Sequence, residues 1–314
     1  MIAYLESFSI MASTYGILAL AVNLQWGFTG FMNWGIGVFY LIGAYSSTLI
    51  TTAQSPQHLG GFGLHFFVGL IGAAIICSIV AFFLSFPTLK VQPNFVAIFL
   101  LAVSEIIRTV FINERWLGNG IWGIQGIPKP FVSQVGPENF DHLYLGLTLA
   151  ILALVYYVVE KAGRSPWGRT LKAIGEDETM AATSGKNVWK YKMQSFVISA
   201  GIAGMAGSLY AHYASYIDPT AFTPWMATFI VWLMVIIGGT GNNRGVILGS
   251  FAVWAIWIFS ENLANLLPLE PTVVGYIRMM VTGFLLWVVL VTRPRGILGK
   301  PKAISTFTDD GEGS

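Results

Sequence analysis

Long apolar runs recur along this sequence, separated by short polar stretches. The runs do not alternate polar and apolar positions, as the strands of a membrane β-barrel would. Most approach the roughly 20 residues that an α-helix needs to cross a bilayer. The sequence therefore predicts membrane helices near residues 2–26, 29–50, 66–86, 92–112, 142–160, 191–214, 225–239, 245–266 and 272–292.

These runs predict an all-α polytopic membrane protein with about nine segments, or between about eight and ten when run boundaries shift by a few residues. The second and seventh runs are glycine-rich or short, so we expect either to be broken or re-entrant. We expect one transmembrane domain over residues 1–300. The acidic, small-residue tail 301–314 has too few apolar residues for a core and is predicted to be disordered.

Lysine and arginine are distributed unequally between the two sets of loops that alternating helices create. Of 17 basic residues, 13 fall on one side, and Arg108, Arg115, Lys129 and Arg278 fall on the other. Because basic residues accumulate on the cytoplasmic side of membrane proteins, the first side is predicted to be cytoplasmic. In a bacterial or archaeal inner membrane, nine crossings then place the N-terminus outside and the C-terminus inside. The outer side carries a long loop, residues 113–141.

Composition strengthens the membrane assignment and narrows the possible chemistry. Of 314 residues, 55% are hydrophobic and 10% are charged, whereas soluble domains carry about 25% charged residues. The net charge of +2 is too small to indicate a nucleic-acid partner. No nucleotide-binding P-loop, G-x-S-x-G or H-E-x-x-H motif is present, and the four histidines lack metal-ligand spacing. We therefore expect no catalytic, metal or cofactor site in this chain, and a membrane-embedded enzyme is the weakest function class.

A strongly charged stretch, residues 163–187, interrupts the apolar pattern on the predicted cytoplasmic side. Seven of its 25 residues are charged. Ser165 followed by proline is typical of a helix start. Trp167, Leu171 and Ile174 then form an apolar stripe with helical spacing. The stretch therefore predicts a short amphipathic helix.

A second short helix is predicted after a bend at Gly175. Glu176, Asp177 and Glu178 follow this bend, where acidic side chains favour the positive end of a new helix. Gly185 is a typical helix stop. A partner protein could bind such a helix pair in a groove on its own surface. The alternative is an ordinary charged loop that only enforces topology.

Two glycine-rich stretches interrupt the predicted membrane helices. Glycines there either let helices pack closely or mark broken helices beside a transport pathway. For any single glycine, and for the stripe Gly201, Gly204 and Gly207, close packing is the simpler interpretation. Glu105 is a charge inside the fourth run and can pair with Arg108, so a structural ion pair is the alternative to a substrate contact. The candidate pathway residues are Gly30, Asn33, Gly35, Gly37, Glu105, Gly238, Gly239 and Gly241.

Several motifs occur in one order along the chain. The first reads G-R-x-L-x-A-I-x-E-D-E, followed by an alanine-rich turn and Gly-x-Asn. It is carried by Gly168, Arg169, Leu171, Ala173, Ile174, Glu176, Asp177, Glu178, Ala181, Ala182, Gly185 and Asn187. KMQSFVISAGIAGMAGSLYA, MVIIGGTGNNRGVILGS and RPRGILG follow. Over residues 16–300 the chain thereby resembles the inner-membrane permease subunits of ATP-binding cassette (ABC) importers for branched-chain amino acids, the LivM-like group, which includes urea and short-amide relatives.

This resemblance implies a type II-like importer permease fold in which residues 161–190 form a segment that docks on an ATPase; we name it the coupling segment. It implies, as partners, a second homologous permease, two ATPase subunits, a periplasmic or lipid-anchored solute-binding protein and membrane lipid. ATP and Mg²⁺ would be bound by the ATPases and not by this chain. The implied substrates are branched-chain or other hydrophobic amino acids.

The chain departs from the family pattern at a few positions. Gly175 stands where the family usually has arginine, so the ATPase partner is expected to be matched to this chain. Phe31, Asn33 and Ile36 replace the usual glutamine, serine and histidine of the first glycine-rich stretch. A pathway lined by that stretch would be more apolar and would favour a hydrophobic solute over urea. A permease for urea or short amides remains an alternative, as does a passive small-solute channel that needs no ATPase.

Overall fold

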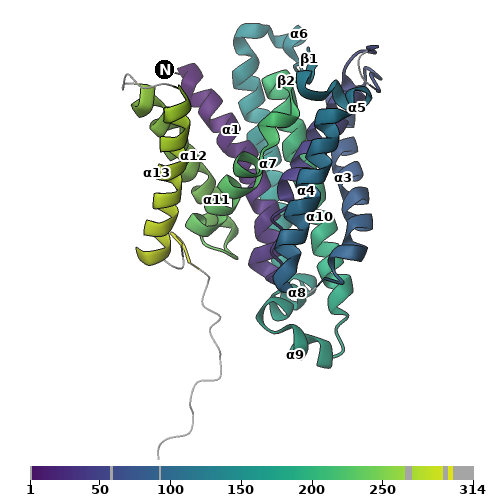
Figure 1. Ribbon diagram of the computed structural model, residues 1–314, viewed down its shortest axis with the longest axis vertical. Coiled ribbons are helices and arrows are strands. Elements are labelled where there is room, and N and C mark those ends of the chain that lie inside the picture. Colours follow the sequence, from purple (N-terminus) through teal and green to yellow (C-terminus); the bar gives the residue numbers. More distant parts are fainter. Residues whose placement is uncertain (1, 57–58, 92, 266–270, 293–295, 300–314) are drawn as a thin grey trace, which may run out of the picture.

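The computed structural model is mostly helical, and it describes all residues except 1, 57–58, 92, 266–270, 293–295 and 300–314 (Figure 1). The predicted disordered tail lies outside the described residues. The long helices are α1 (Ile2–Val22), α2 (Ile36–Thr51), α3 (Phe66–Thr88), α4 (Pro93–Asn113), α7 (Phe140–Arg164), α10 (Val188–Ala214), α12 (Asn243–Asn265) and α13 (Pro271–Thr292). The shorter helices are α5 (Arg115–Gly118), α6 (Val132–Val135), α8 (Pro166–Glu176), α9 (Glu178–Thr183) and α11 (Ile230–Gly238).

Five helices of the described chain are long and apolar enough to cross a membrane. They are Ala3–Gly27, Phe66–Thr88, Phe95–Asn113, Pro137–Arg164 and Asn243–Ser260. The apolar helices Ile36–Thr51, Trp225–Gly238 and Val273–Phe284 are shorter. These helices fit a polytopic membrane protein, while the count of nine crossings stays a prediction.

The second and seventh predicted segments are irregular. The first helix ends in a π-helical turn, η1 (Asn23–Gly27), and the 28–35 segment joins this turn to α2. The seventh begins with another π-helical turn, η5 (Trp225–Phe229), which continues into α11. π-Helical turns distort the regular hydrogen-bond ladder and are frequent at functional sites. The second run is therefore interrupted over residues 30–35 and the seventh is distorted at η5, whereas η1 ends the first run.

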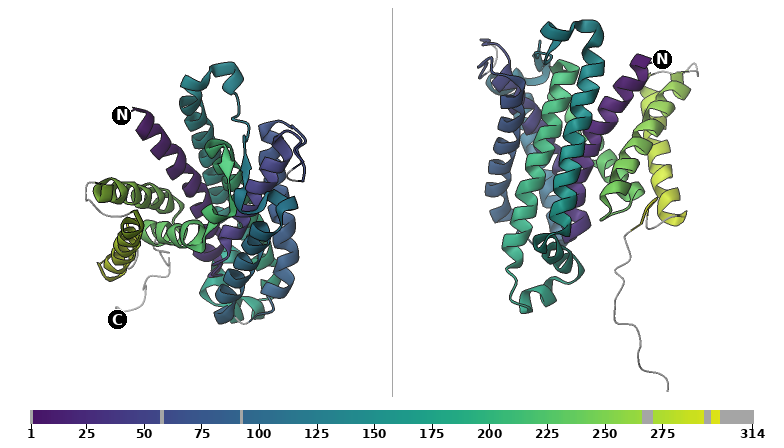
Figure 2. Two further views of the ribbon diagram at one scale, coloured as in Figure 1. Left: turned by 45° about the horizontal axis from the view of Figure 1, so that its top comes forward. Right: turned by 180° about the vertical axis from the view of Figure 1, so that it is seen from behind.

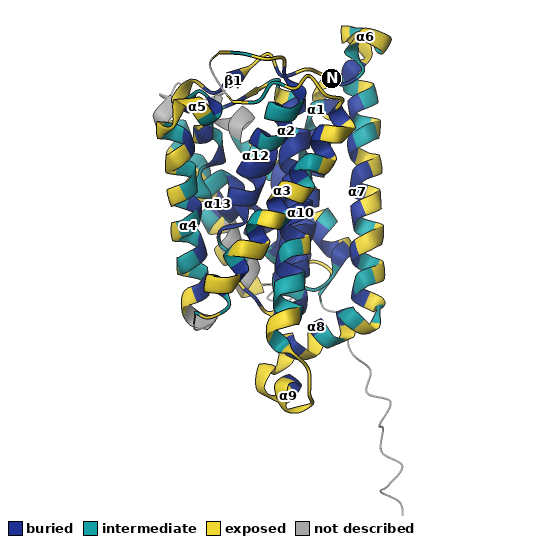
Figure 3. Cartoon of the chain, turned by 90° about the vertical axis from the view of Figure 1, so that its right-hand side faces the viewer, coloured by how far each residue is buried: buried dark blue, intermediate teal, exposed yellow. Residues whose placement is uncertain are grey.

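The helix α10 lies at the centre of the bundle and packs against α2 and α3 (Figure 3). Its small residues permit this packing. A Cβ on Gly207 would lie 2.1 Å from the Tyr40 carbonyl oxygen of α2, and a Cβ on Gly204 would lie 2.6 Å from the Cys77 sulfur of α3. The predicted packing stripe is therefore confirmed, because no larger side chain fits at these two contacts.

The outward faces of α3, α4 and α7 are apolar. Ile75, Phe83 and Ile98 are each more than half exposed, which soluble proteins rarely tolerate in a contiguous patch. These faces suit a lipid environment. Figure 2 shows α11, α12 and α13 on one side of α1 and the remaining helices on the other. The helices α8 and α9 project at the end of the bundle opposite the N-terminus (Figure 1).

The all-α expectation needs one correction, in the long loop 113–141. Two residues of it form β1 (Ile124–Gln125), which pairs antiparallel with β2 (Tyr216–Ile217). The loop also contains two 3₁₀ turns, η2 (Gly120–Trp122) and η3 (Pro137–Asn139), and a third, η4 (Pro219–Phe222), follows β2. The two-residue ladder ties the loop to the end of α10. Such a short pair carries no alternating pattern that a sequence could reveal.

Candidate functional site: the coupling segment and the polar junction

The first helix of the coupling segment, α8, forms as its sequence predicts. The Ser165 hydroxyl accepts a hydrogen bond from the Gly168 amide at 3.3 Å, and proline occupies the first helical position. Because a residue before proline avoids helical geometry, α7 ends at Arg164 and the chain turns there. Leu171 and Ile174 are almost fully buried, so the predicted apolar stripe attaches α8 to the bundle.

The predicted bend at Gly175 is wrong: the chain bends two residues later, at Asp177. Gly175 and Glu176 belong to α8, and Asp177 has extended backbone angles, with φ −151° and ψ 110°. Its carboxylate accepts hydrogen bonds from the amides of Thr179 at 2.8 Å and Met180 at 2.9 Å. Asp177 is thus the N-cap of α9. A residue that caps a helix must leave helical geometry, and this requirement sets the bend.

Gly175 instead allows α8 to lie directly against the 28–35 segment. A Cβ on Gly175 would lie 2.6 Å from the Phe28 carbonyl oxygen, closer than any side chain tolerates. On the facing 28–35 segment, Gly30 has a φ of +69°, and a Cβ on Gly30 would contact the Gly175 carbonyl oxygen at 3.5 Å. We name this pair of backbone contacts the glycine seat. It joins the coupling segment, expected to dock on an ATPase, to the first glycine-rich stretch, expected to border the pathway.

The second helix, α9, ends at the predicted glycine. Gly185 has a φ of +77°, its amide donates to the Ala182 carbonyl, and the Lys186 amide donates to the Ala181 carbonyl at 3.2 Å. This is the left-handed stop that glycine favours. Glu178 forms an ion pair with Lys192 of α10, which holds α9 against the bundle.

The coupling residues divide between a buried and an exposed face. Gly168, Leu171, Ile174 and Ala181 are buried, whereas Arg169, Ala173, Glu176, Asp177, Glu178, Ala182 and Gly185 are exposed. The exposed face carries a groove of about 600 Å³ between α8 and α9, which we name the docking groove. Arg169, Glu176 and Lys186 border it, and Met180 is 69% exposed beside them. The segment therefore presents charged and apolar side chains outward on a fixed base.

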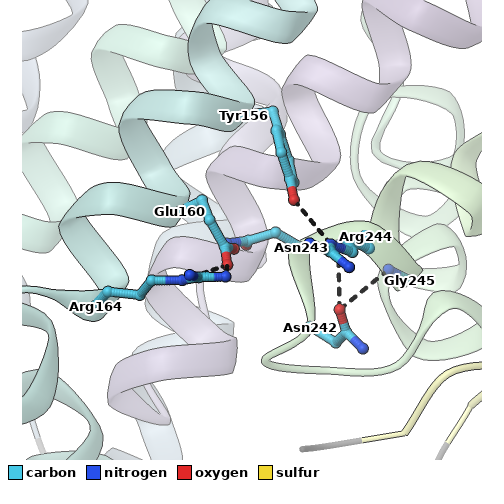
Figure 4. Close-up of polar contacts among 7 residues, drawn as sticks. All are labelled: Tyr156, Glu160, Arg164, Asn242, Asn243, Arg244 and Gly245. Carbon is cyan, nitrogen blue, oxygen red and sulfur yellow. Dashed lines mark hydrogen bonds and ion pairs between the residues drawn. The ribbon is translucent and has the colours of Figure 1, made fainter.

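A chain of hydrogen bonds connects the end of α7 to the start of α12, next to the coupling segment (Figure 4). The Glu160 carboxylate accepts hydrogen bonds from Arg164, four residues along α7, and from the Asn243 amide group at 2.8 Å. The side-chain amide oxygen of Asn243 accepts a hydrogen bond from the side-chain amide nitrogen of Asn23 at 2.8 Å. The Asn23 oxygen accepts from the Gly241 backbone amide, also at 2.8 Å. We name this set the polar junction.

The polar junction brings together the two glycine-rich stretches. Asn23 lies in η1 and is fully buried, and Asn243 is also buried, so the loss of either amide would leave its partners unsatisfied. A Cβ on Gly27 would lie 2.7 Å from the Gly241 nitrogen. Sequence reasoning missed Glu160 and Asn243. The only signal was a pair of asparagines beside glycine, in the stretch GTGNNRG, and it does not reveal which groups these amides meet.

Most candidate pathway glycines lie at close backbone contacts. A Cβ on Gly35 would lie 2.5 Å from the Leu100 carbonyl oxygen, and one on Gly238 would lie 2.3 Å from the Gly245 oxygen. Gly239 and Gly241 have positive φ angles in the turn between α11 and α12. The amide of Gly37 donates to the Thr228 hydroxyl at 3.3 Å. These contacts explain the glycines by packing and leave their place in a pathway a prediction.

An aromatic cluster joins η1, the 28–35 segment and α11. The Trp232 ring centroid lies 4.6 Å from that of Trp26 and 5.4 Å from that of Trp34. The Trp232 indole donates to the buried Asn33 backbone carbonyl at 3.2 Å. Trp26 and Trp34 are half-buried, so part of this aromatic surface is open.

A model of the family described as the permease component of branched-chain amino acid transport systems matches residues 4–290. This chain belongs to that family. The match covers every long helix of the described chain almost completely, and both regions of the candidate site fall inside it.

Curated relatives agree with this assignment. The LivM permease protein of the high-affinity branched-chain amino acid transport system of Salmonella typhimurium is 29% identical over 311 residues, covering 92% of this chain and 68% of the relative. A probable LivM permease of Methanocaldococcus jannaschii is 27% identical over 324 residues, covering 93% and 92%. The Salmonella typhimurium LivH permease is 29% identical over 305 residues and 93% of both chains. No solved structure matches the chain.

Glu105 of this permease chain pairs with Arg108 of its own helix at 2.8 Å. Three hydrogen bonds join the two side chains, and 36% of the Glu105 side chain is exposed. This geometry is that of a structural ion pair within α4. A contact between Glu105 and a substrate stays a prediction.

Proposed function

We propose that this chain is one of two permease subunits of an ABC importer for branched-chain or other hydrophobic amino acids. A second homologous permease completes the pathway, two ATPase subunits bind and hydrolyse ATP with Mg²⁺, and a periplasmic or lipid-anchored protein delivers the solute. The observation that carries the proposal is the coupling segment. It is a capped helix pair with a buried base and an exposed groove, in a chain of the branched-chain amino acid permease family.

The distribution of basic residues supports a cytoplasmic location for the coupling segment. Arg169, Lys172, Lys186 and Lys190 are all exposed on it, and basic residues favour the cytoplasmic side. The N-terminus then lies outside the cell and the C-terminus inside. The ATPases would meet α8 and α9 at this face.

The aromatic cluster supports an apolar pathway. Trp26, within the π-helical turn η1, and Trp34 offer partly open aromatic surface, and irregular membrane helices commonly border transport pathways. Aliphatic side chains gain more from such a surface than urea does, because contact with it removes apolar area from water. Motion of the ATPases would reach this region through the glycine seat and the polar junction.

Reconstitution of the complete importer in proteoliposomes tests the proposal. Glu176 is exposed on the docking groove, so Glu176→Lys should leave the chain folded and ATP hydrolysis measurable while leucine uptake falls at least tenfold. Glu138→Lys is the matched control, because Glu138 is equally exposed in η3 at the opposite end of the bundle. Leucine uptake that persists without ATP or ATPases would instead support a passive channel and overturn the proposal.

A further inference from the structure

A cavity of about 530 Å³ lies beside the glycine seat. The 28–35 segment, the connection between α3 and α4, the start of α4, the end of α8 and the starts of α9 and α10 surround it. Phe31, Met32, Val96 and Ile174 supply apolar walls. The cavity is distinct from the docking groove, with which it shares only Glu176.

Charged residues of both signs line the same cavity. The Lys192 ammonium is ion-paired with Glu178, and only 12% of the Lys192 side chain is exposed. An ammonium has three donors, so Lys192 retains donors for a further acceptor. The Glu176 carboxylate also borders the cavity and makes no hydrogen bond or ion pair with another described residue. One cation and two carboxylates thus lie beside a cavity whose walls are partly apolar.

These groups select the charge of an occupant. A simple anion, such as a fatty acid or phosphate, would meet two carboxylates for one ammonium. A simple amine would pair with Glu176 but would leave the remaining N–H donors of the largely buried Lys192 without an acceptor. A zwitterion with an aliphatic side chain satisfies both signs and also buries apolar surface, which is favourable at about 25 cal/mol per Å². The volume of the cavity exceeds what one such amino acid needs.

We propose that this cavity binds a free aliphatic amino acid and that the bound amino acid restrains the coupling segment. The carboxylate lies on Lys192, the ammonium on Glu176, and the side chain against Met32 and Ala97. Because the walls belong to elements on both sides of the glycine seat, an occupant resists their relative movement. The regulatory role rests on the proposed function and on the proposed membrane orientation. An imported amino acid that binds this cavity from the cytoplasmic side then slows further import.

Equilibrium binding of tritiated L-leucine to the purified full-length chain, in phosphatidylcholine nanodiscs without ATPases or binding protein, tests the site. Ala97 lines the cavity on α4, so Ala97→Phe should abolish saturable binding. Lys192→Gln should raise the Kd roughly tenfold or more, because a charge-assisted hydrogen bond is lost. Ala102→Phe is the matched control: Ala102 is exposed on the same helix and does not line the cavity. This variant should bind leucine as the original chain does.

Ligand analogues test the charge argument. Leucinamide lacks the carboxylate and 4-methylpentanoate lacks the ammonium, so each should compete with leucine at least roughly tenfold more weakly than unlabelled leucine. Leucine binding that Ala97→Phe leaves intact would place the amino acid elsewhere and overturn the proposal. Displacement of leucine by phosphatidylethanolamine in the nanodisc would assign the cavity to a lipid and also overturn it.

The regulatory step has its own measurement in the reconstituted importer. Leucine enclosed on the ATPase side should lower the uptake rate of the original chain and of Ala102→Phe, but not that of Ala97→Phe. Uptake that is ATP-driven yet insensitive to enclosed leucine in all three chains would overturn the inference and leave the proposed function standing. Loss of ATP-driven uptake in the original chain would instead count against the proposed function, while leucine binding to the isolated chain is still measurable.

Discussion

The coupling segment and the polar junction meet at the end of α7, yet they are built in different ways. In the coupling segment the helix caps depend on close neighbours: Ser165 caps α8 three residues ahead, and Asp177 caps α9 two and three residues ahead. In the polar junction Asn23 meets Asn243, 220 residues away. A local device can be recognised in the sequence, whereas a long-range contact depends on how the helices assemble.

The glycine seat stands between these two cases, because Gly175 is part of a local motif but acts through a distant contact. This suggests an order of sensitivity. A close backbone contact cannot relax when a side chain is added, so the glycine seat should be most sensitive. Removing a buried side-chain amide leaves its hydrogen-bond partners unsatisfied, and this should cost less. Exposed helix caps and ion pairs should contribute least to stability.

The largest effect is expected for Gly175→Val. The added side chain would collide with the Phe28 carbonyl oxygen, since even a Cβ would lie 2.6 Å from it. We expect destabilisation of about 3 kcal/mol from overpacking, measured as a lower Tm in detergent, together with loss of uptake. Gly146→Val is the control, because nothing lies within 4 Å of a Cβ on Gly146 of α7. Equal Tm values for the two variants would show that the glycine seat does not hold α8.

A smaller effect is expected for Asn243→Leu. The replacement leaves the buried Asn23 amide and one oxygen of Glu160 without their hydrogen-bond partner, which costs about 2 kcal/mol. The measurement is the Tm of the purified chain, with the adjacent Asn242→Leu as comparison. Among the described residues, the Asn242 side chain bonds only backbone groups of its own turn and of Gly299, so its loss should lower the Tm less. The reverse ranking would contradict the importance of the polar junction.

Asp177→Ala should act locally, on α9 alone. The loss of an N-cap costs about 1 kcal/mol, so the amides of Thr179 and Met180 should exchange hydrogen roughly fivefold faster. Hydrogen exchange followed by mass spectrometry measures this change. Glu176→Ala is the control, since Glu176 caps no helix. Unchanged hydrogen exchange in Asp177→Ala would show that Asp177 does not cap α9.

The smallest effect is expected for Glu178→Gln. The Glu178 side chain is 48% exposed, and ion pairs of this kind contribute less than about 1 kcal/mol and are screened by salt. The Tm difference from the original chain should be small at low ionic strength and should vanish near 1 M salt. A larger difference that persists at high salt would show that Lys192 depends on this partner more than its exposure indicates.

Much of the fold could be predicted because membrane helices leave long apolar runs, and irregular helices leave glycines. The glycine-rich second run, for example, is interrupted over residues 30–35 and becomes helical only from Ile36. The position of the bend was mistaken because a glycine in a charged stretch resembles a helix end. Only its contact with Phe28 reveals that Gly175 continues α8. The β1–β2 ladder has two residues per strand, too few for a pattern.

By itself the sequence determined the membrane character, the start of α8, the stop after α9 and the packing stripe on α10. These features depend on hydrophobicity, small size and hydrogen bonds between near neighbours. Only the tertiary structure decided that Gly175 faces Phe28, that Asn23 and Glu160 share Asn243, and that Lys192 and Glu176 border one cavity. A polar or glycine residue in a membrane helix can serve many contacts. Which one it makes depends on the elements that the packed bundle places beside it.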